Sequence, residues 1–279
     1  MKENEIKYLT KEEITKTKRM CKNIRRAILE MVYSAQSGHI GGSLSCVDIL
    51  TVLYHHVMNL KINKKTGLRT DKFVMSKGHA SPAYYAVLSS KGFIDPEELK
   101  TFRNINSFLE GHPTNKIPGV DTGSGSLGQG LSIANGFAMA NKIDKIEDSW
   151  VYCLLGDGEL EEGQVWEAAM TAGHYVLNNV IAVVDYNCLQ IDGKLSEVKS
   201  PEPIKDKFIA FKWDVIEIDG HDVDAICQAF TAAKLSDKPT CIIAYTTKGK
   251  GISFMENKAE WHGKAPNEKE FKLAKGELK

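Results

Sequence analysis

The sequence contains no apolar run of about 18 residues, the length needed to cross a bilayer, and no basic-then-apolar leader at its start. It also lacks an excess of charge of either sign, because Lys plus Arg and Asp plus Glu both number 36. A balanced charge gives no general attraction to nucleic acid or to an anionic membrane. We therefore expect a soluble, cytoplasmic protein whose partners are neither nucleic acid nor membrane.

Cysteine is sparse and scattered. The six cysteines form no Cys-x-x-Cys pair, and the sequence has no His-Glu-x-x-His motif. Disulfide frameworks and zinc sites depend on such spacings, so both are disfavoured. Buried thiols in a reducing compartment are the favoured interpretation.

Apolar runs alternate with helical patterns along the 279 residues. Runs at 73–75, 150–155, 180–184, 213–218 and 240–246 predict strands. Helical spacing predicts helices at 10–37, 47–58, 82–88, 96–102, 130–140 and 223–235, and a charged, solvated tail at 267–279. Strands separated by helices build a parallel sheet. We expect an α/β fold with a doubly wound, mostly parallel sheet flanked by helices, in one domain over residues 1–279.

The most informative local feature is the turn Gly156-Asp157-Gly158, which directly follows a predicted strand. The next predicted strand ends at Asp185-Tyr186-Asn187, one strand-helix-strand unit later. Asp157 and Asn187 should therefore meet at the carboxyl edge of the sheet, where open α/β folds bind ligands. Carboxylate, amide and carbonyl oxygens suit Mg²⁺ carrying a diphosphate, and the glycines let the backbone approach that anion. The alternative is an ordinary turn.

A second glycine-rich segment, from Gly119 to Gly130, opens a helix of small residues. Glycine density at a helix start is typical of close backbone approach to a flat or anionic ligand. On composition alone, a flexible surface loop explains the segment equally well.

Short motifs follow one another in a fixed order along nearly the whole chain. They are Ser37-Gly38-His39, Lys77-Gly78-His79-Ala80-Ser81, Gly111-His112-Pro113, Gly125-Ser126-Leu127-Gly128-Gln129-Gly130, Gly156-Asp157-Gly158, Asp185-Tyr186-Asn187 and His262-Gly263. In this order they resemble the diphosphate-binding domain of transketolase, a thiamine diphosphate enzyme. The resemblance implies the thiamine diphosphate-binding fold and that cofactor.

The resemblance also implies roles for individual residues. Mg²⁺, or Ca²⁺ or Mn²⁺ in its place, would be bound by Asp157, Asn187 and the carbonyl of Leu189. The cofactor would contact His79, Gly125, Ser126, Leu127, Gly156, Asp157, Gly158, Glu162, Asn187, Leu189 and His262. Ser126 departs from the family pattern, in which most members carry proline, and this leaves the loop less stiff.

The catalytic residues that the resemblance implies are His39, His79, His112 and His262. His39 would exchange a proton with a substrate hydroxyl, and His112 would hydrogen-bond the donor sugar near its carbonyl. Imidazole suits both roles because it titrates near neutrality. Among the other histidines, His55 and His56 are expected on a helix, and His221 is interpreted as part of a strand-to-helix turn with an aspartate cap.

Glu162 and Glu167 match acidic residues that, in this family, belong to a carboxylate network at the subunit interface. From spacing alone, Glu159, Glu161 and Glu162 cluster at a helix start, where the helix dipole favours acids on a solvated face. Both interpretations stay open.

The chain resembles the amino-terminal subunit of a split transketolase of the pentose phosphate pathway, an enzyme that transfers a two-carbon ketol unit from a ketose phosphate to an aldose phosphate. In this family the glutamate that activates the cofactor lies on a pyrimidine-binding domain. That domain, the carboxy-terminal domain and the arginines for sugar phosphates are expected on a separate chain. We therefore expect activity only with this partner, in an α2β2 heterotetramer.

Three alternatives remain. The chain could belong to a split transketolase for a specialised sugar, sulfonated or branched. It could be a subunit of another carboligase, similar to 1-deoxyxylulose 5-phosphate synthase, although the contexts of His79 and His262 favour transketolase. It could also be a non-catalytic assembly subunit.

Overall fold

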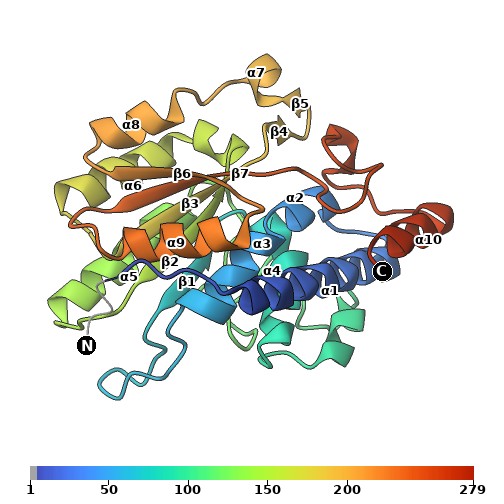
Figure 1. Cartoon of the computed structure of the whole chain (residues 1–279), viewed down its shortest axis with the longest axis horizontal. Helices are drawn as coiled ribbons and strands as arrows, with labels where there is room; N and C mark the ends of the chain where they lie inside the picture. The colour runs from blue at the N-terminus through green and yellow to red at the C-terminus, as the bar shows by residue number, and fades with distance from the viewer. Residues whose placement is uncertain (1–4) are drawn as a thin grey trace.

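The computed structural model describes residues 5–279 and contains a five-stranded sheet. Its strands are β1 (Lys72–Met75), β2 (Val151–Gly156), β3 (Val180–Tyr186), β6 (Asp214–Asp219) and β7 (Thr240–Tyr245). They lie in the order β1-β2-β3-β7-β6, and every neighbouring pair is parallel. The α/β class and the five strands predicted from the sequence are confirmed (Figure 1).

Helices cover both faces of the sheet because side chains alternate along each strand. One face packs against α1 (Lys11–Ala35), α3 (Val47–Val52), α4 (Ser81–Ser90) and α9 (Val223–Ala233). The other packs against α5 (Gly130–Ile143), α6 (Gly163–His174) and α8 (Ile204–Ala210). In β2, Tyr152 and Leu154 enter the first layer, and Cys153 and Leu155 enter the second. A strand buried on both faces explains the unbroken apolar run in the sequence.

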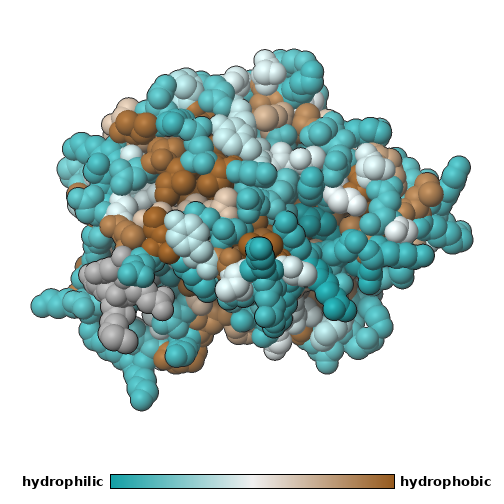
Figure 2. Space-filling model, viewed as in Figure 1, coloured by the Kyte–Doolittle hydropathy of each residue, from teal (hydrophilic) through white to brown (hydrophobic). Residues whose placement is uncertain are grey.

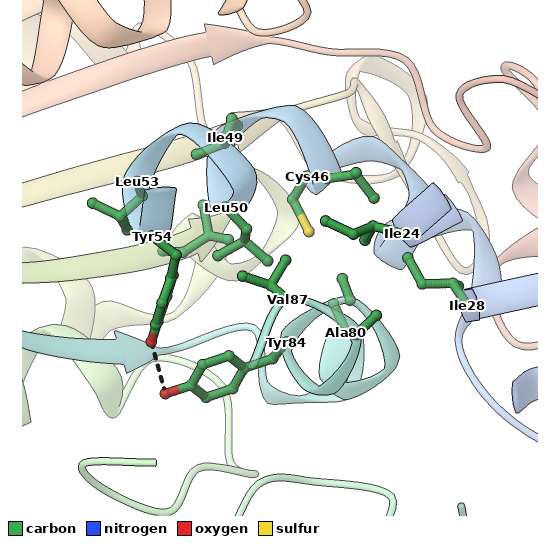
Figure 3. Close-up of a cluster of buried hydrophobic side chains, with 14 of the residues drawn as sticks. Ile24, Ile28, Cys46, Ile49, Leu50, Leu53, Tyr54, Ala80, Tyr84 and Val87 are labelled. Atoms are coloured by element: carbon green, nitrogen blue, oxygen red, sulfur yellow. Dashed lines mark hydrogen bonds between the residues drawn. The ribbon is translucent and has the colours of Figure 1, made fainter. Parts of the chain in front are cut away.

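The layer beside β1 is built where α1, α3 and α4 meet. Figure 3 shows side chains of these helices in contact, among them Ile24, Ile28, Leu50, Tyr84 and Val87. The π-helical turn Leu53–Val57 continues α3, and the hydroxyl of its Tyr54 donates to the hydroxyl of Tyr84 over 3.2 Å. This packing fixes two segments of the site, because His39 follows α1 and His79 precedes α4.

Helix α1 begins and ends as the sequence predicts. Thr10 caps it, and Glu13 completes a capping box. After Ala35 the chain turns at Gly38, which has a φ of +143°. A Cβ at Gly38 would lie 2.9 Å from a methyl group of Val32, so glycine is required where the chain turns toward His39.

Shorter elements complete the fold. They are α2 (Ile40–Ser45), the hairpin of β4 (Leu189–Gln190) and β5 (Gly193–Lys194), α7 (Leu195–Val198), and 3₁₀ turns at Gly78–Ala80, Pro96–Thr101, Gly158–Glu161 and Ala259–Trp261. Helix α10 (Glu268–Glu277) lies beside α1 in Figure 1. The predicted solvated tail is thus partly packed: Phe271 stacks on Tyr33, with ring centroids 3.9 Å apart.

The surface is largely polar. In Figure 2 hydrophilic residues cover most of the visible face, and an apolar patch shows over the edge strand β6, between α8 and α9. Within residues 5–279, no helix combines the length and the apolar composition that a membrane span requires.

Candidate active site

The carboxyl ends of four strands bring polar side chains together. Lys77 follows β1, Asp157 follows β2, Asn187 follows β3, and Lys248 follows β7. All four line a cavity of about 290 Å³. Loops at this edge of a parallel sheet converge on one point, which is why open α/β folds bind ligands there.

Most of the residues predicted from the sequence line this cavity. They are His39, His79, His112, Gly125, Leu127, Gly156, Asp157, Gly158, Asn187, Leu189 and His262. Ser126 and Glu162 do not line it, and both are exposed. Glu162 instead packs beside the glycine-rich loop. Its Cβ would lie only 2.8 Å from a Cβ placed on Gly128. Glu167 is also exposed, so the interface role of both glutamates stays a prediction.

Asp157 is the buried carboxylate of the site. One oxygen accepts the amide of Gly158 at 2.9 Å, and the other accepts the amides of Asn187 at 2.8 Å and Cys188 at 2.6 Å. Burial raises the pKa of Asp157 to about 6, and the nearby carboxylate of Asp185 adds to the increase. A cation bound beside Asp157 would stabilise its ionised form.

Two further oxygens lie beside this carboxylate. The side-chain oxygen of Asn187 accepts the amide of Leu189 at 3.2 Å. The carbonyl of Leu189 accepts the ammonium of Lys248, also at 3.2 Å. The three predicted metal ligands therefore lie close together at the carboxyl edge of the sheet. Each of their oxygens also accepts a hydrogen bond from the protein. Carboxylate, amide and carbonyl oxygens are the donor types that Mg²⁺ prefers.

A buried ion pair supports the floor of the site. The ammonium of Lys77 donates to Asp185, and to the carbonyl of Gly42 at 2.9 Å. Asp185 also accepts the hydroxyls of Ser45 and Thr246. Burial alone would lower the pKa of Lys77, but the charge of Asp185 raises it. Lys77 is thus a permanent cation that Asp185 compensates.

Lys248 is the contrasting cation. Its side chain is almost fully buried, and its ammonium donates to the Leu189 carbonyl and, at 2.8 Å, to Nδ1 of His262. Among the residues that the structure describes, Lys248 makes no ion pair with a carboxylate. Burial lowers the pKa of Lys248 to about 8, and the charge of Lys77 adds to the decrease. An anion in the cavity would supply the missing countercharge.

Four imidazole rings face the same cavity. The ring centroid of His39 lies 5.2 Å from that of His79, 5.4 Å from that of His262 and 6.4 Å from that of His112. His79 and His262 are stacked, with centroids 5.3 Å apart. Buried Nδ1 of His39 has no hydrogen-bond partner within residues 5–279, and the ring itself lines the cavity.

All four histidines are held neutral. Burial lowers the pKa of His39 to about 4, and the charge of Arg103 adds to the decrease. Burial and Arg103 also lower the pKa of His112. Burial lowers the pKa of His262 to about 3, with Lys248 contributing, and that of His79 well below its usual value, with Lys77 contributing. Neutral imidazoles can accept protons and can also donate hydrogen bonds.

Glu159 corrects the prediction that its acidic cluster lies on a solvated helix face. Glu159 is 2% exposed, and its carboxylate accepts the hydroxyl of Ser76 and the amides of Gly128 at 2.9 Å and Gly156 at 3.0 Å. Burial raises its pKa, although these donors oppose the increase. Glu159 therefore ties the glycine-rich loop to the ends of β1 and β2, which argues against a freely flexible loop.

Several cavity residues escaped the sequence-based assignment. They are Gly42, Lys77, Glu159, Gln190, Ile191 and Lys248. Lys77 lies within a recognised motif, but the motif assigns it no role. Lys248 follows the apolar run of β7, so its position at a strand end is the one signal available. Neither lysine can be recognised as buried before its partners are known.

Comparison with known proteins identifies the family. A family model described as the transketolase, thiamine diphosphate binding domain matches residues 16–279. The chain belongs to the transketolase family. This confirms the resemblance inferred from the ordered motifs, and the family match supports thiamine diphosphate as the cofactor. Transketolases are transferases, so the family is an enzymatic one.

Two relatives are of similar length to this chain. One apulose-4-phosphate transketolase subunit, from Phocaeicola vulgatus, is 44% identical over 255 residues, which cover 91% of this chain and 90% of that protein. The 6-deoxy-6-sulfo-D-fructose transketolase subunit SqwG of Clostridium sp. is 42% identical over 257 residues, which cover 91% of this chain and 93% of that protein. The predicted similarity to subunits of split transketolases is confirmed.

A solved structure shows the same fold. The transketolase of Campylobacter jejuni superposes with a TM-score of 0.87 at 38% sequence identity, over 94% of this chain. This chain spans only 43% of that transketolase chain.

Proposed function

We propose that this chain is the diphosphate-binding subunit of a split transketolase. It transfers a two-carbon ketol unit from a ketose to an aldose, using thiamine diphosphate and Mg²⁺ together with a partner subunit. The observation that carries this proposal is the cavity itself, where four neutral histidines and the uncompensated ammonium of Lys248 face the oxygens around Asp157.

The residues present fit a magnesium diphosphate. The charge of Lys248 and the glycines around Asp157 suit an anion, while Asp157, Asn187 and the Leu189 carbonyl suit a hard cation. Within residues 5–279, no three His, Cys, Asp or Glu side chains come together as a metal site. Asp157, Asn187 and the Leu189 carbonyl would hold the metal ion, and Lys248 would face the diphosphate that accompanies it.

The chain's own residues then have distinct tasks. When bound, the cofactor supplies the carbanion chemistry that breaks and forms a carbon–carbon bond beside a carbonyl. Because Nδ1 of His262 accepts from Lys248, the proton of its neutral ring lies on Nε2, where it can donate to the diphosphate. His79 stacks beside it and contributes a second neutral ring. Leu127 and Ile191 give the wall an apolar part.

Proton transfer is assigned to the histidine that follows α1. His39 is neutral and its ring lines the cavity, so it can take a proton from a substrate hydroxyl and return it. His112 also lines the cavity and can donate a hydrogen bond to the donor sugar near its carbonyl. Neither task needs a charged imidazole in the resting state.

The partner supplies the remaining catalytic and substrate-binding residues. By family analogy a companion subunit carries the pyrimidine-binding glutamate and the arginines that recognise sugar phosphates, in an α2β2 assembly. The names of the two relatives, which refer to apulose 4-phosphate and to 6-deoxy-6-sulfo-D-fructose, favour a specialised ketose as a second candidate substrate class. A role in the pentose phosphate pathway and a cytoplasmic location remain predictions.

The test is turnover by the reconstituted complex. The purified chain is mixed with its companion, thiamine diphosphate and Mg²⁺, and offered xylulose 5-phosphate with ribose 5-phosphate, then apulose 4-phosphate and 6-deoxy-6-sulfofructose as donors. We expect ketol transfer from at least one ketose. Absence of transfer from every ketose contradicts the proposal, and decarboxylation of pyruvate identifies the rival carboligase.

A matched pair of variants separates a catalytic role from an assembly role. Asp157→Ala abolishes turnover of the complex if this chain holds the metal. Asp237→Ala, an exposed aspartate at the opposite edge of the sheet, leaves turnover unchanged. Full activity of the Asp157→Ala complex would show that the chain is a scaffold.

A further inference from the structure

One histidine near the carboxyl edge of the sheet does not line the cavity. His221 lies in the turn between β6 and α9, where Asp222 caps α9 as the sequence predicts. Its side chain is 14% exposed, and both ring nitrogens are hydrogen-bonded. A ring so fully engaged needs an explanation beyond a simple turn.

The hydrogen bonds of His221 fix its tautomer. The amide of Thr247 donates to Nε2 over 2.8 Å, so Nε2 carries no proton. The proton of the neutral ring therefore lies on Nδ1, where Oδ2 of Asp48 accepts it over 2.7 Å. Although burial would raise it, hydrogen bonds from His221 and the charge of Arg25 lower the pKa of Asp48 to about 2. An ionised acceptor holds the ring in this orientation.

Asp48 is itself held in place by a residue of another helix. It lies on α3 and is 5% exposed. Arg25 of α1 donates to its Oδ1 over 3.2 Å and also forms an ion pair with Oδ2. A third bond of Arg25 reaches the carbonyl of Leu44 at 3.4 Å. The imidazole of His221 is thus fixed through Asp48 to the packed helices α1 and α3.

The sheet explains why Thr247 needs a side-chain acceptor. Strands β6 and β7 pair as far as Asp219 and Tyr245. The amide of Thr246 still donates to the Tyr186 carbonyl of β3 at 2.9 Å. At the next residue, Thr247, strand β6 has already turned away toward α9 and offers no carbonyl. Nε2 of His221 accepts the hydrogen bond from the Thr247 amide instead. An unpaired amide at this depth would cost stability.

The turn is shaped to fit against this segment. A Cβ at Gly220 would lie 2.4 Å from the methyl group of Thr246, so only glycine permits the contact. The amide of Gly220 donates to the carbonyl of Tyr245 at 2.8 Å. His221 and the residues after β7 are therefore held in a fixed relation.

The segment that His221 holds leads directly into the site. Thr246 bonds Asp185, and Lys248 reaches the Leu189 carbonyl and His262. We propose that His221 is a positioning residue, whose Nε2 holds the Thr247 amide so that Lys248 points into the cavity and strengthens binding of the diphosphate. The consequence for the diphosphate rests on the proposed function.

Two substitutions distinguish the two nitrogens. His221→Gln places an amide oxygen near the position of Nε2 and can still accept from Thr247. His221→Asn places its amide near Nδ1 and cannot reach Thr247. In the complex with Mg²⁺ and the companion chain, we expect the Kd for thiamine diphosphate to stay within about twofold in the Gln variant and to rise about tenfold in the Asn variant. Equal affinities in the two variants, whether native or weakened, would overturn the proposal.

A second measurement needs neither cofactor nor partner. In the full-length wild-type chain, ¹⁵N NMR of His221 should show a protonated Nδ1 and a bare Nε2, and the Thr247 amide should be protected from hydrogen exchange. This protection should persist in the Gln variant and fall about tenfold or more in the Asn variant. The opposite tautomer, or an unprotected Thr247 amide in the wild type, overturns the positioning role.

The two measurements separate this proposal from the proposed function. If the wild-type complex takes up no thiamine diphosphate, the proposed function fails, while tautomer and amide exchange still decide whether His221 holds Thr247. Thermal unfolding of both variants checks that they fold. If the Asn variant does not fold, the wild-type tautomer, the wild-type Thr247 exchange and the Gln variant decide the question.

Discussion

Two buried aspartates lie at opposite edges of the same sheet. Asp157 follows β2 at the carboxyl edge, and Asp71 precedes β1 at the amino edge. Each accepts backbone amides, each borders a cavity, and burial raises the pKa of both. By these features alone, either could mark a functional site.

Their surroundings separate them. The cavity beside Asp71 is the larger, about 870 Å³ against about 290 Å³. Asp71 joins structural donors, namely the amides of Asn59 at 2.8 Å and Trp150 at 3.0 Å and the hydroxyl of Tyr152 at 3.5 Å, and the charge of Lys234 acts on it as well. Asp157 instead faces a second carboxylate, buried lysines and four histidines. Convergence of groups with shifted pKa values, and not cavity volume, distinguishes the functional edge.

The largest expected effect is at Asp157. Asp157→Ala removes the one carboxylate of the proposed metal site and leaves the diphosphate charge poorly compensated. We expect the affinity of the complex for thiamine diphosphate with Mg²⁺ to fall about 100-fold, which corresponds to about 3 kcal/mol. Calorimetric titration measures it. An affinity within about twofold of the wild type would remove the distinction between the two edges.

His39 tests the chemistry of the carboxyl edge separately from binding. His39→Ala should lower turnover of the complex about 100-fold, because no other imidazole is assigned to the substrate hydroxyl. Cofactor affinity should remain nearly native. The matched control is His56→Ala, a histidine of the amino-edge cavity, which should leave turnover unchanged. A cofactor-binding defect in His39→Ala would mean that His39 holds the cofactor instead.

Asp71 tests the amino edge. Asp71→Asn replaces an acceptor oxygen with a donor that faces amides of Asn59 or Trp150. We expect the free energy of unfolding to fall by about 2 kcal/mol, measured by urea denaturation, with cofactor affinity unchanged. Weakened cofactor binding in a stably folded Asp71→Asn chain would show that both edges serve the ligand.

Arg103 offers the smallest and most specific effect. Its guanidinium bonds Ser37 at 2.7 Å, and its charge, after burial, helps to lower the pKa values of His39 and His112. A neighbouring cation disfavours imidazolium, so Arg103→Gln should raise both pKa values. As pH falls, activity should therefore be lost at a higher pH than in the wild type, as the pH profile of kcat/KM would show.

The control for that shift is Arg19→Gln, an exposed arginine on α1. It should leave the acid limb of the profile in place. An unmoved acid limb in Arg103→Gln would assign the low histidine pKa values to burial alone.

Local patterns predicted much of the fold and part of the site. The apolar runs gave all five strands of the sheet, and the spacing of Asp157 and Asn187 gave their meeting at its edge. These features depend on strand-end residues and on short, regular connections, which a sequence displays directly. The ordered motifs added the histidines, and the structure brings His39, His79, His112 and His262 together.

The acidic cluster after Gly158 marks where local reasoning failed. Helix-start spacing gave Glu159 and Glu162 the same environment, yet Glu159 is buried and Glu162 is exposed. The difference comes from Ser76 and Gly128, which are distant in sequence and meet Glu159 only in the folded chain. Propensity and dipole arguments describe a helix end but not what packs on it.

The sequence by itself determined the alternation of strands and helices, the carboxyl-edge turn and the identity of the family, because these depend on neighbours along the chain. The tertiary structure alone decided which charges are compensated. Lys77 meets Asp185 across 108 positions, and His221 meets Asp48 across 173, while Lys248 has no carboxylate partner within the described residues. Burial and pairing depend on three-dimensional contacts, and these set the charge and the pKa of each group in the site.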